Sequence, residues 1–125
     1  MILGVGIDLT ASEPWREALQ DPSGAAVEAC FTPGERAAAA AGPVPPAERL
    51  AARWAAKEAF LKALGAAPRR LDPREIEVLA EAGGVPTLRL HGAARAAAGA
   101  RGVRRTWLSL THDGAFAAAV VVIEG

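Results

Sequence analysis

The sequence predicts an α+β fold in which one long helix packs on a mainly antiparallel sheet. The first observation behind this prediction is residues 47–64, which lack glycine and proline and consist of strong helix formers. The second is two pairs of short apolar runs, each pair separated by a glycine-containing turn, as is typical of hairpins. The third is the length of 125 residues, which predicts a single domain spanning residues 1–125.

The first half of the chain predicts one strand and one short helix ahead of the long helix. Residues 2–9 are apolar and β-branched enough to form a buried strand, with Asp8 where that strand leaves the core. Residues 10–30 are broken by prolines and glycine, so they predict short helical turns at most. Thr32 and Glu35 have the spacing of a capping box, which predicts a helix that begins at the proline between them.

The second half of the chain predicts two hairpins on either side of a short helix. Gly83-Gly84 suits a turn at positive φ, and Asp113-Gly114 is among the commonest pairs in a type I′ turn. The strands and the helix are expected over residues 76–79, 85–90, 92–100, 107–112 and 115–123.

Composition argues against a nucleic-acid-binding protein and against a membrane protein. The 14 basic and 14 acidic residues cancel, so charge favours neither a nucleic acid nor a membrane as partner. No apolar run is long enough to span a membrane, and a single cysteine, Cys30, is compatible with a reducing compartment. We therefore expect a cytoplasmic protein. Much of the apolar content is alanine, which gives a thin core and favours oligomerisation.

Asp8, Glu58 and Lys62 are the candidates for a reactive site. If the long helix crosses the end of the first strand, the two carboxylates meet with the lysine beside them. Two carboxylates, water and phosphate oxygens are a typical Mg²⁺ shell. Each residue also has an ordinary explanation: Asp8 caps a turn or helix, and Glu58 and Lys62 form a surface ion pair worth about 0.2–0.5 kcal/mol. The residues alone leave these alternatives open.

Other polar residues have simple structural explanations as well. Lys57 lies on the apolar stripe of the long helix, where its stem can follow apolar surface with the ammonium in water. His112 ends a strand, where it donates to a phosphate, relays a proton, or has no chemical task. We expect His91 to be a helix-end residue without a catalytic task, and Cys30 to behave as a small apolar residue.

Four segments together resemble the 4′-phosphopantetheinyl transferase superfamily, and their order and spacing resemble its short holo-(acyl-carrier-protein) synthase group. They are Gly4-Val5-Gly6-Ile7-Asp8, Phe31-Thr32 with Glu35, the helix block RWAAKEAFLKALG from Arg53 to Gly65, and Ser109-Leu110-Thr111-His112. The resemblance covers nearly the whole chain and implies the fold of that superfamily.

The resemblance implies transfer of the 4′-phosphopantetheine arm of coenzyme A to a serine of an apo acyl carrier protein, with release of adenosine 3′,5′-bisphosphate. It implies Mg²⁺ held by Asp8, Glu58 and the coenzyme pyrophosphate, with Lys62 neutralising charge on the leaving group. Glu58 is implied as the base for the serine proton. The resemblance also implies a homotrimer with active sites between subunits.

By the same resemblance, a set of residues would line the coenzyme site. This set is Arg53, Lys57, Lys62, Gly84, Pro86, Thr111 and His112. One departure concerns Val85, which stands where the family often has a basic residue, so a nucleotide phosphate contact is missing or comes from elsewhere.

A second departure concerns the carrier protein. The segment Ser12-Glu13-Pro14-Trp15 replaces a stretch that usually carries arginine. We therefore expect docking of the carrier by Arg16, Arg36, Arg49 or Arg53, with Trp15 adding an apolar contact.

Two other functions compete with the transferase. One is a catalytically inactive module that binds coenzyme A or the carrier protein. The other is a small trimeric scaffold in which Glu58 and Lys62 are only structural. The presence of Asp8, Glu58 and Lys62 together favours the enzyme.

Overall fold

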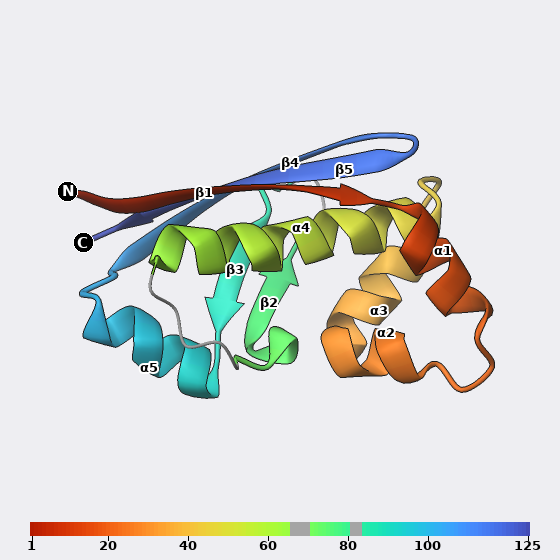
Figure 1. Ribbon diagram of the computed structural model, residues 1–125, viewed down its shortest axis with the longest axis horizontal. Coiled ribbons are helices and arrows are strands. Elements are labelled where there is room, and N and C mark those ends of the chain that lie inside the picture. Colours follow the sequence, from red (N-terminus) through yellow and green to blue (C-terminus); the bar gives the residue numbers. More distant parts are fainter. Residues whose placement is uncertain (66–70, 81–83) are drawn as a thin grey trace.

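The computed structural model describes residues 1–65, 71–80 and 84–125. Its elements follow in the order β1 (Ile2–Ala11), α1 (Glu13–Gln20), α2 (Ala25–Cys30), α3 (Pro33–Ala40), α4 (Pro46–Leu64), the 3-10 turn η1 (Pro73–Glu75), β2 (Ile76–Leu79), β3 (Thr87–Leu90), α5 (Gly92–Ala100), β4 (Arg105–Asp113) and β5 (Phe116–Glu124) (Figure 1). In these ranges no helix combines the length and hydropathy needed to cross a membrane.

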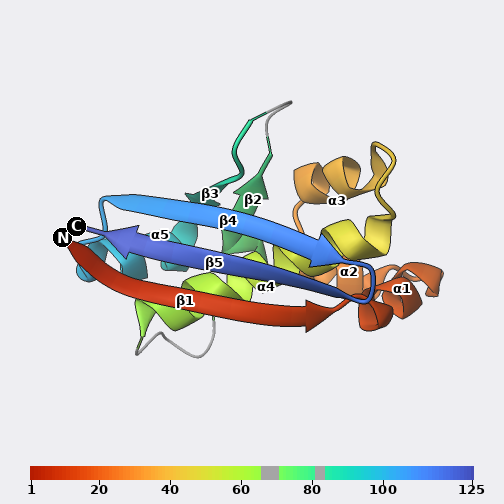
Figure 2. The same cartoon turned by 90° about the horizontal axis from the view of Figure 1, so that it is seen from above.

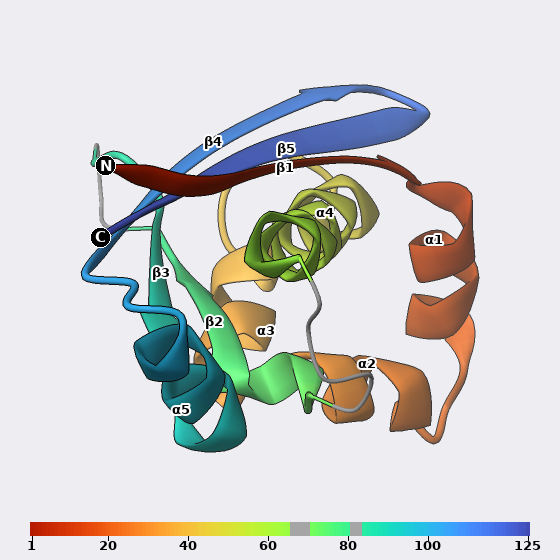
Figure 3. The same cartoon turned by 60° about the vertical axis from the view of Figure 1, so that its left-hand side comes forward.

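An antiparallel sheet of three long strands forms one layer, in the order β1-β5-β4. Figure 2 shows these strands side by side, with the two chain ends adjacent. Strands β2 and β3 pair separately as an antiparallel hairpin. Figure 3 looks nearly along α4 and shows the long sheet on one side of this helix and the other elements around the rest of it. The predicted α+β architecture is confirmed.

Two glycines let α4 approach β1 unusually closely. A Cβ atom at Gly6 would lie 1.8 Å from the carbonyl oxygen of Ala59, and one at Gly4 would lie 2.0 Å from that of Ala63. Only glycine fits at such a distance. Because side chains alternate along a strand, Asp8 is the next residue after Gly6 on the face toward α4. The Gly-x-Gly-x-Asp spacing thus brings a carboxylate beside the helix.

The described residues form two apolar clusters joined by α4. One lies between α4, the long sheet, the β2–β3 hairpin and α5. The other lies under α1, α2 and α3, where the Trp15 ring packs 4.9 Å from that of Phe31 and 5.5 Å from that of Trp54, between centroids. Trp15 is buried, so the expectation that it adds an apolar contact for the carrier is wrong.

Residues 10–30 are more helical than predicted, because they contain α1 and α2. Pro14 lies in the first turn of α1, where a missing N–H loses no helical hydrogen bond. The proline therefore begins a helix instead of interrupting one. The helix predicted after Thr32 is confirmed, with both hydrogen bonds of its capping box present.

The last hairpin turns one residue later than predicted. Asp113 pairs with Phe116, so Gly114 and Ala115 form the loop. A type I′ turn needs positive φ at both loop residues. Among the described residues only glycines have positive φ, including Gly114 at 53°, so this part of the prediction is wrong. The other hairpin is confirmed by the pairing of β2 with β3, although part of its predicted Gly83-Gly84 turn lies outside the described residues.

Candidate active site

The structure brings Asp8 and Lys62 into contact at the β1 edge of the long sheet. The Lys62 ammonium lies 3.0 Å from Asp8 Oδ1 and donates a second hydrogen bond of 3.0 Å to the carbonyl oxygen of Ile7. The Thr10 hydroxyl donates to Asp8 Oδ2 at 2.6 Å. Asp8 therefore joins a strand to a helix, and the alternative that it only caps a turn or helix is wrong.

Glu58 lies one helical turn before Lys62, within the field of both charges. Burial raises the pKa of the Glu58 carboxyl, the charge of Asp8 raises it further, and Lys62 acts in the opposite direction. Among the described residues, Lys62 is paired with Asp8 and not with Glu58. The alternative of a simple Glu58–Lys62 surface pair is therefore wrong. The result is a part-buried carboxylate with raised proton affinity next to a second carboxylate and an ammonium.

These two carboxylates are suited to a hard divalent cation. A shared cation would relieve the repulsion from Asp8, which adds to the effect of burial in raising the pKa of Glu58. Within the described ranges, no cluster of three or more histidine, cysteine or acidic side chains is arranged for a metal. A cation at Asp8 and Glu58 would thus take its other ligands from water and an anionic substrate, as Mg²⁺ commonly does.

A second group of predicted site residues meets on the other side of α4. Arg53, Pro86 and His112 line one pocket of about 280 Å³, and Arg49 lines it with them. Arg53 is only 4% exposed, and its Nη1 donates to the carbonyl oxygen of Arg49 at 3.3 Å. His112 Nδ1 lies 3.9 Å from Glu48 Oε1. This pocket is separate from the group formed by Asp8, Glu58 and Lys62.

The geometry of α4 explains the separation. Arg53 and Glu58 are five residues apart, which turns their side chains roughly 140° from each other around the helix axis. Asp8 belongs to β1 and His112 to β4, and these strands form opposite edges of the long sheet. Within one chain, the group of Asp8, Glu58 and Lys62 and the pocket of Arg53 and His112 therefore lie at opposite edges of the long sheet.

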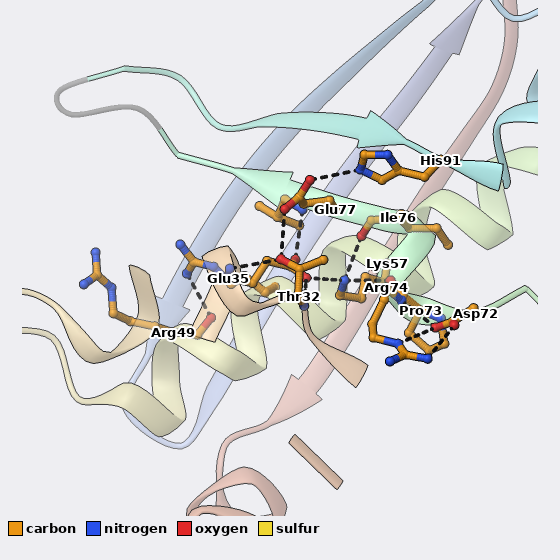
Figure 4. Close-up of polar contacts among 12 residues, drawn as sticks. Thr32, Glu35, Arg49, Lys57, Asp72, Pro73, Arg74, Ile76, Glu77 and His91 are labelled. Atoms are coloured by element: carbon orange, nitrogen blue, oxygen red, sulfur yellow. Dashed lines mark hydrogen bonds and ion pairs between the residues drawn. The ribbon is translucent and has the colours of Figure 1, made fainter. Parts of the chain in front are cut away.

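Lys57 belongs to neither group. Its side chain is 1% exposed, and its ammonium donates to Glu35 Oε1 at 2.8 Å and to the carbonyl oxygens of Pro73 and Ile76 at 2.7 Å each (Figure 4). The expectation of an ammonium in water is wrong. All three of its hydrogens are already donated inside the protein. The structure thus gives Lys57 a different role from the coenzyme contact that the resemblance implies.

Glu35 is the partner that sequence reasoning missed. Its buried carboxylate accepts hydrogen bonds from Lys57 and from the backbone N–H groups of Thr32 and Val78, at 2.8–3.0 Å. Figure 4 shows how this contact continues through Thr32 to Glu77 and His91. The capping-box spacing identified Glu35 locally, but no local pattern reveals a partner 22 residues away.

The remaining predicted residues lie on the surface. Thr111 is exposed on β4, with its neighbour His112 directed to the opposite face of the sheet, and Gly84 is exposed ahead of β3. Arg16 pairs with Glu13, and Arg36 lies 3.9 Å from Glu28. None of these side chains joins Asp8, Glu58 and Lys62 in the described part of the chain.

Cys30 has no feature of a reactive thiol. Burial raises its pKa, the charge of Lys57 lowers it, and Asp72 and Arg74 act in opposite directions. A raised pKa disfavours the nucleophilic thiolate.

Comparisons with known proteins agree with the fold. The sequence model of the 4′-phosphopantetheinyl transferase superfamily matches residues 4–121. The chain is 43% identical over 123 residues to a holo-[acyl-carrier-protein] synthase of Frankia alni, covering 98% of each protein.

The chain is also similar to solved structures of acyl carrier protein synthases. The acyl carrier protein synthase of Mycobacterium tuberculosis is 40% identical with a TM-score of 0.75, covering 99% of this chain and 98% of that one. The ACPS–CoA complex of Chronobacterium ammoniagenes is 34% identical with a TM-score of 0.81, covering 96% and 95%.

Proposed function

Because the chain belongs to the 4′-phosphopantetheinyl transferase superfamily, we propose that it transfers the 4′-phosphopantetheine group of coenzyme A to a serine of an apo acyl carrier protein. The other product is adenosine 3′,5′-bisphosphate. The observation that carries this proposal is the meeting of Asp8, Glu58 and Lys62 at the β1 edge. A lysine beside two carboxylates suits phosphoryl-group transfer, in which stabilising negative charge is the main task. Coenzyme A as co-substrate is supported by the CoA complex among the similar structures.

The reaction forms one phosphorus–oxygen bond and breaks another. The carrier serine oxygen attacks the pyrophosphate phosphorus that bears the pantetheine group. The bond from this phosphorus to the bridging oxygen breaks, and that oxygen leaves with adenosine bisphosphate. Glu58 accepts the serine proton, because its raised pKa makes it a stronger base than an ordinary carboxylate. Lys62 compensates the negative charge of the leaving bisphosphate.

Mg²⁺ is the proposed cofactor, held by Asp8 and Glu58. When bound, it supplies further neutralisation of the pyrophosphate charge. The contact of Lys62 with Asp8 holds the ammonium beside the carboxylate that would bind Mg²⁺. The ammonium and the cation would therefore both lie close to the pyrophosphate of coenzyme A.

The proposed assembly is a homotrimer built on the outer face of the long sheet. This face carries exposed large apolar side chains, namely Val5, Ile7, Leu9, Trp107, Phe116 and Val120. Large apolar patches of this kind mark interfaces between proteins. An arrangement that brings the β1 edge of one subunit to the β4 edge of the next would join Asp8, Glu58 and Lys62 to the pocket of Arg53.

Arg16 and Arg36 are the proposed docking residues for an acidic carrier. They lie on α1 and α3, and both are at least partly exposed to solvent. The cellular location that fits this chemistry is the cytoplasm, where a lone cysteine such as Cys30 stays reduced.

The experiment that tests the function measures the mass of an apo carrier protein after incubation with the full-length enzyme, coenzyme A and Mg²⁺. We expect a mass gain of one phosphopantetheine group, and a loss of at least about 100-fold in rate for Glu58→Gln. Glu17→Gln, at an exposed position on α1 whose carboxylate takes part in none of the ion pairs among the described residues, is the matched control and should keep the full rate. Coenzyme A binding without any mass gain across a panel of carriers would instead support the inactive binding module.

A further inference from the structure

We propose that Arg101 is a positioning residue that holds the last turn of α4 against the start of β1 and thereby keeps Lys62 beside Asp8. Its part in catalysis rests on the proposed function and deepens it by adding a residue from outside the site that sequence reasoning assembled. Arg101 lies at the end of α5, and it acts on Lys62 through the backbone of α4.

The Arg101 guanidinium bridges the two elements that position the acidic group. Its Nη1 donates to the carbonyl oxygen of Leu64, the last residue of α4, and its Nη2 donates to that of Leu3 on β1 at 3.2 Å. The last carbonyls of a helix have no partner within the helix, and a cation near them also interacts favourably with the helix dipole. Figure 1 shows the ends of α4 and α5 and the start of β1 at the same end of the molecule. One side chain thus caps the helix and ties it to the strand.

The backbone at the end of α5 fixes the point from which Arg101 reaches across. Arg101 is the C-cap residue of α5, and Gly102 follows it with a φ of 77°. The N–H of Val103 donates to the carbonyl oxygen of Ala98 at 3.0 Å, and Ala98 is buried in the cluster against which Val103 packs. The N–H of Gly102 donates to the carbonyl oxygen of Gly99 at 2.9 Å, which completes a Schellman motif. Only the side chain of Arg101 therefore has to be ordered to form the bridge.

The end of α4 leaves room for the guanidinium. Gly65, the C-cap residue of α4, has a φ of 77°, and a Cβ atom there would lie 3.2 Å from Arg101 Nη1. A side chain at this position would strain the backbone and press on the guanidinium as well. Gly65 also donates its N–H to the carbonyl oxygen of Lys62 at 3.2 Å. The turn that Arg101 caps is thus the turn that carries Lys62.

Lys62 depends on this turn because its side chain is 56% exposed and is not held by packing. Its ammonium reaches back to the carbonyl oxygen of Ile7 and to Asp8 Oδ1, both at 3.0 Å. A long exposed side chain loses such contacts when the backbone beneath it moves. In the proposed reaction Lys62 neutralises charge that develops on the leaving group. A small displacement therefore lowers the rate of the chemical step more than the affinity for coenzyme A.

The kinetic test is a double-mutant cycle in the full-length protein, read by carrier mass at high enzyme concentration. We expect Arg101→Gln to lower kcat by about tenfold, with the Michaelis constants for coenzyme A and the carrier within about twofold of the wild type. In the Lys62→Ala background the same substitution should lower kcat no further, because Arg101 acts through Lys62. Arg101→Lys should keep part of the rate. Arg95→Gln, which removes the same charge from an exposed position on α5, is the matched control and should keep all of it.

Hydrogen exchange of the backbone amides of residues 62–65 gives a readout that does not depend on transfer. We expect these amides to exchange about tenfold faster in Arg101→Gln than in the wild type or Arg95→Gln, because the last turn loses its cap. The inference is overturned if their exchange is unchanged, or if Arg101→Gln lowers kcat by the same factor with and without Lys62. Faster exchange in Arg101→Gln, combined with a wild type that transfers nothing, would contradict the proposed function and still support the positioning of Lys62 by Arg101.

Discussion

Lys57 and Glu58 are adjacent in the sequence but have different surroundings. The Lys57 ammonium is enclosed by Glu35 and two carbonyl oxygens, whereas Glu58 is only partly buried near Asp8. Helical periodicity places these side chains about 100° apart and predicts that they face different environments. It does not predict that the Lys57 ammonium is buried against a carboxylate from another helix, Glu35 of α3.

The buried pair leads to a prediction about stability. Lys57→Met leaves the Glu35 carboxylate buried without its counter-charge, so we expect the free energy of unfolding to fall by about 3–5 kcal/mol. Urea denaturation followed by circular dichroism measures this change. The double variant with Glu35→Gln should recover part of the loss, because the amide oxygen still accepts from backbone N–H groups.

Lys62→Ala is the matched control for this prediction. It removes the same charge from an exposed ion pair, so it should cost at most about 1 kcal/mol of stability while removing most of the turnover. Equal losses of stability in Lys57→Met and Lys62→Ala would contradict the different roles assigned to them.

At the scale of elements, β1 and α4 determine the position of the acidic group. The strand and the helix were predictable from apolar patterning and helix propensity, and both are present within two residues of their expected ends. Their close approach was not predictable, because it depends on which face of each element meets the other. The same limit applies to Pro14, whose effect depends on whether it falls at the start or in the middle of a helix.

The contact between these elements can be tested by adding a single methyl group. In Gly6→Ala the new Cβ would meet the Ala59 carbonyl oxygen at 1.8 Å, so the helix must move away from the strand. We expect a loss of about 1–3 kcal/mol in the free energy of unfolding, together with a large loss of transferase activity as Asp8 separates from Lys62.

Gly99→Ala in α5 is the control for Gly6→Ala, because no atom lies within 4 Å of its added Cβ. It should leave activity unchanged and stabilise the protein by up to about 1 kcal/mol through helix propensity. If Gly6→Ala were as harmless as Gly99→Ala, the close packing of β1 on α4 would not be what positions Asp8.

At the scale of the whole molecule, the predicted site is divided between two edges of one sheet. Asp8, Glu58 and Lys62 lie at the β1 edge, and Arg53, Pro86 and His112 line a pocket near the β4 edge. The order of motifs along the chain does not reveal this division, because strand order differs from sequence order. In the proposed trimer, the exposed apolar face between these edges would be the surface through which neighbouring subunits join them.

A site shared between subunits can be recognised by mixing two inactive variants. In a trimer of Lys62→Ala and Arg53→Gln chains, one interface pairs the intact lysine of one variant with the intact arginine of the other. Every mixed trimer contains one such site among its three, and random assembly from equal amounts makes about three quarters of the trimers mixed, so co-expressed chains should recover about a quarter of the wild-type activity. The measurement is the rate of carrier modification at limiting coenzyme A, compared with that of each variant alone. If mixing gave no recovery although mass measurements showed mixed trimers, each site would have to be built from one chain, and the outer sheet face would have no part in catalysis.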